Sequence, residues 1–346
     1  MFEFHKYPSI DNTYRTKTIN YILQHECSKV EWMVLLKVHG ANFSVWTDGK
    51  TVKTARRTSF LKDAENFGSW QTVIGALKDK FIAAFEWLVM ENLVEKEVVF
   101  WGELAGGEYP HPNVKKSLHA KKVQKGVFYA PSNFFYMFDI TCDGKFISHD
   151  ILSLVGDFFD IMYAKPLKRG TFAELLDYPN EFEDPLYLEF GLPVLTTEML
   201  KGNKNTCEGI ILKPVEPAFF GNGARVILKN KNDKFKENNG EKKNRVPKEK
   251  YVWSGQGAKL FTLLSTYVSE NRLRNVLSHG LDVGQKDFGK LMKELNVDVW
   301  GDYIIDNGDE FECLEIIEQK MIKSSINKLS ANLIRPNFQN IIDKEF

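Results

Sequence analysis

A lysine stands at the end of an apolar segment near the start of the chain. Residues 32–36 read WMVLL and residues 37–43 continue as KVHGANF, so Lys37 is followed by His39 and Gly40. Most lysines in such a position are surface residues that end a buried strand and reach into water. A lysine can also be a nucleophile, provided that neighbouring cations and partial desolvation lower its pKa from the ordinary value of about 10.4. These two interpretations predict different surroundings for Lys37.

Three carboxylates border apolar segments elsewhere in the chain. Glu103 ends the run VVFWGE and precedes two glycines, Asp139 lies in YMFDI, and Glu208 precedes GIILKP. A carboxylate beside a buried segment is stable when it is paired with a cation or binds a metal ion. Taken singly, each is equally consistent with an ordinary residue at the end of a strand.

Lys229 and Lys231 alternate in the segment RVILKNK. Successive side chains of a strand point to opposite faces, so these two share a face if the strand continues. Two like charges on one face repel each other, which is tolerated at an exposed edge or is useful beside a phosphate.

The elements that must position these residues are short strands. Apolar or alternating runs predict strands at 31–36, 42–46, 51–55, 98–104, 134–140, 209–214 and 225–229. Asp48 and Gly49 form a hairpin turn dipeptide. Between the strands, Trp70, Ile74 and Phe81 belong to an apolar series at helical spacing. We therefore expect an α+β fold built on antiparallel sheets.

The composition changes after residue 229. Residues 229–250 hold nine Lys or Arg against four acids, and the latter part, 236–250, is typical of a basic linker. Beyond it the apolar period is helical, with stripes that begin at Leu260 and at Phe288, and a further helix is expected over 309–334. We predict a first domain over 1–235 and a small all-helical C-terminal domain over 251–346.

The composition also excludes some classes of protein. The formal net charge of the 346 residues is zero, so nucleic-acid binding must come from local patches. The four cysteines are scattered, which argues against structural zinc and suits a reducing compartment. No segment is long and apolar enough for a membrane span, and the first residues do not resemble a leader. We expect a monomer in the cytoplasm, or in the host cytoplasm if the source is a virus.

Taken together, the motifs have a recognisable order. They are KxHG (37–40), ARR (55–57), GE (102–103), FDI (138–140), EGxxLK (208–213) and KxK (229–231). Their order and spacing resemble the covalent nucleotidyltransferase superfamily, and the histidine of KxHG is typical of its RNA ligase 2 family. DNA ligases and capping enzymes usually carry an aspartate at that position. The similarity covers essentially the whole chain, including GELAGGEYPHP and VQKGVFYAP, which resemble the RNA-editing type, and NRLRNVLS and KDFGKLM, which resemble the C-terminal domain of the bacteriophage type.

The resemblance implies an ATP-dependent RNA ligase that uses Mg²⁺ or Mn²⁺. Lys37 would attack the α-phosphate of ATP, release pyrophosphate and form lysyl-AMP. The AMP would pass to an RNA 5′-phosphate, and an adjacent 3′-hydroxyl would displace it, preferably at a nick in duplex RNA. The task would be RNA repair or editing, with ATP and RNA as the partners.

The family pattern also implies roles for other residues. Glu103 would contact the ribose, Phe138 would stack on adenine, and Glu208 would bind the metal ion or orient Lys37. The remaining nucleotide contacts would be Leu36, Val38, Asn42, Arg57, Lys229 and Lys231, while His39 and Gly40 belong to the signature and Asp139 and Lys213 occupy motif positions whose roles stay open.

Two features depart from the bacteriophage pattern. Leu36 replaces an acidic residue before the nucleophile, so recognition of the adenine edge would rest on the backbone there. The segment between GELAGG and YMFDI is longer, and residues 113–125 carry five lysines and no acid. This segment is either a solvated loop or a contact to the RNA backbone.

The charges of the last hundred residues are less specific. Arg272, Arg274 and Lys286 are candidates for RNA contacts, although ordinary surface charge explains them as simply. The acidic segments 174–189 and 298–318 contain no Lys or Arg and are expected to be solvated faces that repel RNA.

Two other functions are compatible with the sequence. One is a polynucleotide ligase that acts mainly on nicks containing DNA, which the KxHG signature disfavours. The other is a non-catalytic RNA-binding protein that has kept the pocket; it predicts a damaged motif, whereas Lys37, Glu208, Lys229 and Lys231 are all present.

Overall fold

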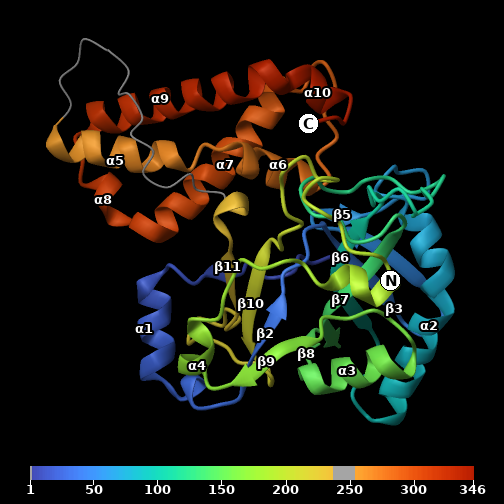
Figure 1. The fold of residues 1–346 in the computed structure, drawn as a ribbon. Helices are drawn as coiled ribbons and strands as arrows, with labels where there is room; N and C mark the ends of the chain where they lie inside the picture. The colour runs from blue at the N-terminus through green and yellow to red at the C-terminus, as the bar shows by residue number, and fades with distance from the viewer. Residues whose placement is uncertain (1, 237–253) are drawn as a thin grey trace. The chain divides into compact units, whose positions relative to one another are not determined.

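The computed structural model describes residues 2–236 and 254–346, which belong to two compact units, Met1–Lys234 and Phe235–Phe346. Figure 1 shows the sheets and their helices in the first unit and the helices of the second. The expected basic linker, residues 236–250, lies outside the described residues except for Lys236. Among the described helices, none has the length and apolar character needed to cross a membrane.

The first unit is built on two sheets in which neighbouring strands are antiparallel, apart from one parallel pair between β1 and β11. The six-stranded sheet has the order β5 (Ser59–Phe60), β4 (Val52–Arg56), β3 (Ala41–Thr47), β6 (Val98–Gly106), β7 (Asn133–Cys142) and β8 (Lys145–Phe146). The five-stranded sheet has the order β1 (Asp11–Asn12), β11 (Leu228–Lys231), β10 (Gly209–Pro214), β2 (Trp32–Leu36) and β9 (Pro166–Gly170). The expected α+β fold on antiparallel sheets is confirmed.

Helices cover the apolar faces of these sheets. The helix α2 (Trp70–Met90) buries Trp70, Ile74 and Phe81 against the six-stranded sheet, as the apolar period predicts, and α3 (His149–Phe158) packs on β7. In Figure 1, α1 (Thr16–Gln24) and α4 (Phe172–Leu176) lie beside the five-stranded sheet, where Ile22 and Phe172 join its core.

The predicted strand positions agree with the structure within two residues, with one exception. We expected a strand over 225–229, but β11 begins at Leu228 and ends at Lys231. The reason is that the N–H of Val226 donates to the carbonyl of Ala218, and Arg225 bridges to Phe219. The start of the segment therefore pairs with a neighbouring loop instead of extending β11.

A buried ionic cluster joins the two sheets. Asp139 of β7 accepts hydrogen bonds from Lys213 of β10 at 3.2 Å, from Arg225 at 3.0 Å and from the Tyr7 hydroxyl at 2.7 Å. Burial alone would raise the pKa of Asp139, but the two cations and Tyr7 outweigh it and lower that pKa. The motif residues Asp139 and Lys213 are thus paired with each other inside the first unit.

The second unit is helical. Leu260, Leu264, Leu291 and Leu295 are buried in one core, as the two apolar stripes predict. Its helices are α5 (Gly255–Thr266), α6 (Glu270–Ser278), α7 (Phe288–Asn307), α8 (Asp309–Glu312), α9 (Ile316–Ile334) and α10 (Phe338–Ile342).

The helix expected over 309–334 is interrupted. The chain leaves the helix after Glu312, and Glu315 is extended, with ψ of 143°, before α9 begins. The side-chain amide of Gln319 donates to the carbonyls of Glu312 and Leu314 at the break, and Phe311 and Leu314 are both buried. The interruption turns both apolar side chains into the core.

One candidate for RNA binding in this unit is wrong. Arg272 is 1% exposed, and its guanidinium is paired with Asp298 at 2.5 Å and Asp302 at 3.1 Å. A buried arginine with two carboxylate partners holds helices together and is not available to a phosphate. The start of the acidic segment 298–318 is therefore a structural partner and not a purely solvated face.

We predict that Asp139→Asn destabilises the first unit by about 3–5 kcal/mol, because it leaves two buried cations without a counter-charge. Denaturant unfolding followed by tryptophan fluorescence measures this loss, since five of the seven tryptophans lie in that unit. Asp160→Asn is the control, because the Asp160 side chain is 96% exposed in its ion pair with Lys80 and its loss is expected to change stability by about 0.5 kcal/mol or less. If both variants lost the same free energy of unfolding, the result would contradict a stabilising role for the ionic cluster.

Candidate active site

Lys37 lies where two strands of the five-stranded sheet meet. Its backbone N–H donates to the carbonyl of Gly209 at 3.0 Å, which joins the end of β2 to the start of β10. Glu208 precedes Gly209, so this pairing brings the two side chains together, and Lys37 Nζ donates to Glu208 Oε2 at 2.8 Å. The side chain of Lys37 is 18% exposed. It is therefore neither a freely solvated surface lysine nor a sealed one.

Glu208 is in contact with three basic side chains. Its Oε1 lies 3.0 Å from Lys231 Nζ, and its Oε2 lies 3.4 Å from His39 Nδ1 as well as accepting from Lys37. Burial alone would raise the pKa of Glu208, but Lys37, Lys231 and His39 outweigh it and hold that pKa well below its usual value. Glu208 is consequently ionised at neutral pH and fixes the position of two lysines.

Asn42 and Glu103 lie opposite each other on β3 and β6, so their side chains share one face of the six-stranded sheet. Glu103 Oε2 is buried and accepts no hydrogen bond within the described part of the chain. Burial raises the pKa of Glu103 to about 8, although nearby Lys37 and Arg57 act in the opposite direction. At neutral pH this carboxyl is largely protonated and can donate a hydrogen bond.

Tyr129 is a site residue that the sequence analysis did not identify. Its hydroxyl, buried in the first unit, accepts the backbone N–H of His39 at 2.7 Å. Burial raises the pKa of Tyr129 well above its usual value, so the group stays a neutral phenol. The available signal was its place in the segment VQKGVFYAP, together with the rule that a buried tyrosine hydroxyl usually finds a partner.

Gly40 is required for close packing in the signature. A Cβ atom at this position would lie 2.5 Å from the carbonyl oxygen of Leu104. The turn after Lys37 can therefore lie directly on β6 only if residue 40 has no side chain.

Phe138 lies directly beside the buried ionic cluster. Lys213 Nζ donates to the carbonyl of Phe138 at 2.9 Å, and the ring of Tyr7 packs edge-on against the Phe138 ring at 5.1 Å. Lys213, which is paired with Asp139, thus also contacts the backbone at Phe138.

The remaining predicted site residues lie on these strands or directly after them. Leu36 and Val38 are buried on either side of Lys37, and Arg57 follows β4. Lys229 lies on β11, opposite Ile211 of β10. It is two residues from Lys231, so both lysines are on one side of the strand. The structure brings Lys37, His39, Glu103, Glu208, Arg57 and Lys231 into one electrostatic neighbourhood, and the roles implied for them remain predictions.

The residues of this site suit a divalent cation that takes most of its ligands from a bound substrate and from water. Within residues 2–236 and 254–346, no three His, Cys, Asp or Glu side chains form a group that could enclose a metal ion. Mg²⁺ commonly takes one or two carboxylates and completes its shell with water and phosphate oxygens. Glu208 is the ionised carboxylate beside Lys37.

Two family models match this chain. The model described as RNA ligase matches residues 30–231, and the model described as T4 RNA ligase 2 C-terminal matches residues 252–332. All of the motif residues discussed above lie inside the first match.

Similar proteins include two RNA-editing ligases from Trypanosoma brucei brucei. The mitochondrial RNA-editing ligase 2 is 25% identical over 99% of this chain and 93% of its own length. The mitochondrial RNA-editing ligase 1 is 27% identical over 64% of this chain, and the match spans only 53% of that protein.

Among solved structures, a Naegleria gruberi RNA ligase mutant with ATP and Mn is 13% identical, with a TM-score of 0.42 over 68% of this chain and 58% of that chain. A second mutant of the same ligase, with AMP and Mn, has a TM-score of 0.40. Because the RNA ligase model matches more than half of the sequence in an unbroken stretch, the chain belongs to the RNA ligase family.

Proposed function

We propose that this protein is an ATP-dependent RNA ligase that seals 3′-hydroxyl and 5′-phosphate ends, preferably at nicks in duplex RNA. The observation that carries the proposal is the contact of Lys37 Nζ with Glu208, with Lys231 on the other carboxylate oxygen. A partly accessible lysine held beside a second cation is the arrangement that an attack on a phosphate requires.

The first step forms a bond between Lys37 Nζ and the α-phosphorus of ATP. The bond from that phosphorus to the bridging oxygen breaks, pyrophosphate leaves, and the lysine nitrogen loses a proton. Glu208 holds Nζ in place before the attack, and Lys229 and Lys231 offset the negative charge that develops on the α-phosphate.

In the next step an oxygen of the RNA 5′-phosphate attacks the same phosphorus and breaks its bond to Lys37. The AMP is then joined to the RNA end through a pyrophosphate linkage. Attack of the 3′-hydroxyl on the 5′-phosphate finally expels AMP and closes the strand. Asn42 and Arg57 are the residues proposed to grip the phosphates in these steps.

The nucleoside would lie between the two sheets of the first unit. Phe138, whose backbone is fixed by Lys213, supplies the aromatic face for adenine. Leu36 and Val38 are buried, so recognition at these positions falls to their backbone groups. Protonated Glu103 can donate to a ribose oxygen, which would satisfy its unpaired buried atom.

A divalent cation, Mg²⁺ or alternatively Mn²⁺, would be held by Glu208 and by phosphate oxygens of the substrate. Its contribution when bound would be to neutralise phosphate charge as a Lewis acid. We expect this protein to act as a monomer in the cytoplasm, whereas both trypanosome relatives are mitochondrial ligases.

Incubation with α-labelled ATP and magnesium is expected to label this protein covalently, and Lys37→Ala is expected to abolish the label, because only Lys37 provides the nucleophile. Denaturing electrophoresis detects the adduct after pyrophosphate has removed any AMP already bound. Lys78→Ala, an exposed lysine of α2, is the matched control and should label normally.

The acceptor is identified by chasing the labelled protein with a nicked RNA duplex, the same duplex with a DNA 3′ end, or separate single strands. Sealing of the RNA nick at the highest rate supports the proposal, and preference for the DNA end supports the alternative polynucleotide ligase. Absence of label in the unmodified chain would eliminate the ligase mechanism and favour the RNA-binding alternative.

Glu103→Gln is expected to stabilise the nucleotide-free protein increasingly as the pH rises. The folded pKa of about 8 lies above the unfolded value, so the unmodified protein loses stability from about pH 4.5 up to pH 8, and the amide variant does not. Thermal unfolding in a chelator should show equal midpoints near pH 4.5 and a gap of at least about 2 °C at pH 8. A difference in unfolding midpoint that did not change with pH would contradict the raised pKa of Glu103. The control is Glu86→Gln, because Glu86 is an exposed residue of α2.

Tyr129→Phe is expected to slow adenylylation of Lys37 by about 10-fold at saturating ATP, because it leaves the partly buried N–H of His39 without its acceptor. Single-turnover labelling measures the rate. Tyr109→Phe is the matched control. Tyr109 is also buried, but its hydroxyl donates to the carbonyl of Pro193, which is not part of the KxHG signature. If both variants lose the same stability and label at the same rate, Tyr129 has no positioning role.

A further inference from the structure

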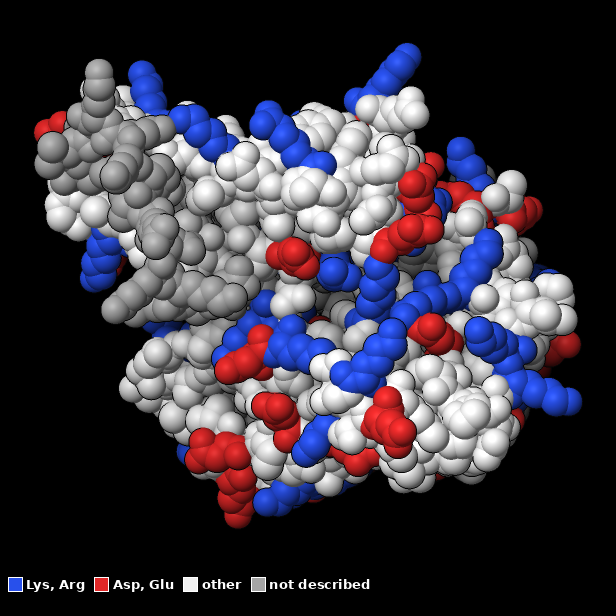
Figure 2. All heavy atoms as spheres, turned by 45° about the horizontal axis from the view of Figure 1, so that its top comes forward, with Lys and Arg blue, Asp and Glu red and all other residues white. Residues whose placement is uncertain are grey.

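Residues 115–125 are rich in lysine, and we call them the basic segment. They have no role in the adenylylation steps proposed above. The segment carries Lys115, Lys116, Lys121, Lys122 and Lys125 and no acidic residue, and all five lysines are exposed. Figure 2 shows that lysine and arginine side chains gather on part of the surface, with individual acidic side chains between them.

The basic segment is fixed to the six-stranded sheet. The N–H of Lys121 donates to the side chain of Asn133 at 2.9 Å, and Asn133 donates back to the carbonyl of Lys121 at 2.7 Å. Val123 N–H donates to the carbonyl of Gly106 at 3.3 Å. A Cβ atom at residue 107 would lie 2.2 Å from the Lys121 carbonyl oxygen, so Gly107 permits this close approach. The lysines therefore project from a defined backbone and not from a loose loop.

The same segment contacts the nucleotidyltransferase signature. The side-chain amide of Gln124 donates to the carbonyl of Gly40 at 3.3 Å, three residues after Lys37. The basic segment is thus attached to the signature three residues from Lys37, beside the place where the proposed function requires an RNA end to bind.

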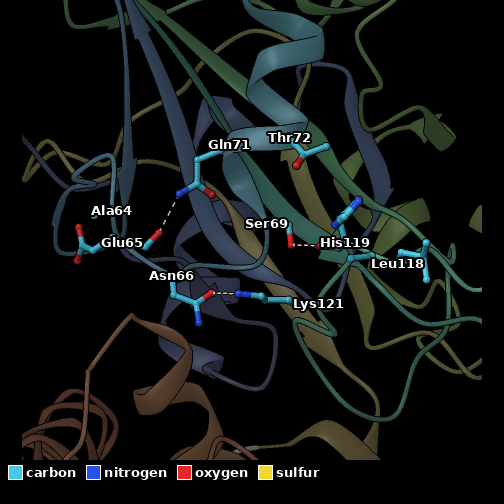
Figure 3. A pocket seen from close by; sticks show the side chains of 10 residues that line it. Ala64, Glu65, Asn66, Ser69, Gln71, Thr72, Leu118, His119 and Lys121 are labelled. Atoms are coloured by element: carbon cyan, nitrogen blue, oxygen red, sulfur yellow. Dashed lines mark hydrogen bonds between the residues drawn. The ribbon is translucent and has the colours of Figure 1, made fainter.

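A pocket of about 420 Å³ opens between the basic segment and residues 64–72. In Figure 3, Lys121 and Asn66 point toward each other across it, joined by a hydrogen bond of 2.5 Å, and Ser69 donates to the carbonyl of His119 at 2.6 Å. The walls combine a cation with hydroxyl and amide groups, which are the groups that contact sugar–phosphate backbones.

The negative charge near this pocket is already neutralised. Glu65, which lines it, is paired with Arg56 at 2.8 Å. Lys122 is paired with Glu108, but no carboxylate within the described residues lies within ion-pair distance of Lys115, Lys116 or Lys121. Three exposed cations therefore have their charge available for an anionic partner.

We propose that Lys115, Lys116 and Lys121, with the adjoining pocket, form a binding surface for the phosphate backbone of RNA beside the break. The proposal rests on the proposed ligase function and adds a substrate contact outside the adenylylation motifs. The surface recognises backbone charge, so it binds RNA without preference for sequence.

The test uses the full chain in which all three lysines are changed to alanine. Binding of a nicked RNA duplex is expected to weaken at least about 10-fold at 0.1 M salt. The slope of log K against log salt should fall by about 2–3, because each lost phosphate contact contributes about 0.7–0.9. Labelling of Lys37 by ATP should be unchanged, since none of the three residues contacts the nucleotide motifs. Lys121→Ala alone should show part of the effect.

The control variant carries alanine at Lys78, Lys145 and Lys168, three exposed lysines of α2, β8 and β9. It loses the same total charge, so equal binding by the two variants would overturn the proposal and attribute any loss to the overall field. The failure of the ligase function would be seen separately, as absence of label on Lys37 in the unmodified chain. RNA binding by that unlabelled chain would still test the surface.

Discussion

The ion pair between Lys37 and Glu208 is the interaction on which the site depends. A carboxylate that is 3% exposed would be unstable if it were alone, and it is kept ionised here by the cations of Lys37 and Lys231. The same carboxylate therefore orients Lys37, the proposed nucleophile, and keeps a second cation nearby. Because Glu208 precedes one strand while Lys37 follows another, the sheet must pair β2 with β10 in this register for the contact to exist. The contact between Lys37 and Glu208 is a consequence of strand register.

Two neighbouring carboxylates of the first unit show how surroundings separate a structural charge from a reactive one. Asp139 has two cations and a tyrosine hydroxyl as partners, its side chain is 1% exposed, and its pKa is lowered. Glu103 keeps one buried oxygen unsatisfied, and its pKa is raised. Both oxygens of Asp139 are used inside the protein, whereas one buried oxygen of Glu103 has no partner among the described residues. This difference supports the proposal that Glu103, and not Asp139, contacts the nucleoside.

Much of this arrangement was predictable from the sequence because strand-end motifs are local. The apolar runs before Lys37 and after Glu208 placed both residues at strand ends, and their family pattern joined them. What could not be predicted depends on contacts between distant segments. Nothing near Arg225 indicates that Val226 pairs with Ala218 and delays β11, and nothing near Arg272 indicates that Asp298 and Asp302 bury it. Tyr129 was missed for the same reason, since its hydroxyl meets a backbone group 90 residues away.

The basic segment shows how a charged surface can lie beside the candidate active site without sharing its charges. The segment is attached through backbone groups and neutral side chains, among them Asn133, Gln124 and the carbonyl of Gly40. None of these bonds uses a charge that the adenylylation site needs. Lys115, Lys116 and Lys121 consequently keep their charge for a polyanion, while Glu208 keeps its own cations. If both proposals hold, the affinity for RNA can change independently of the reaction of Lys37.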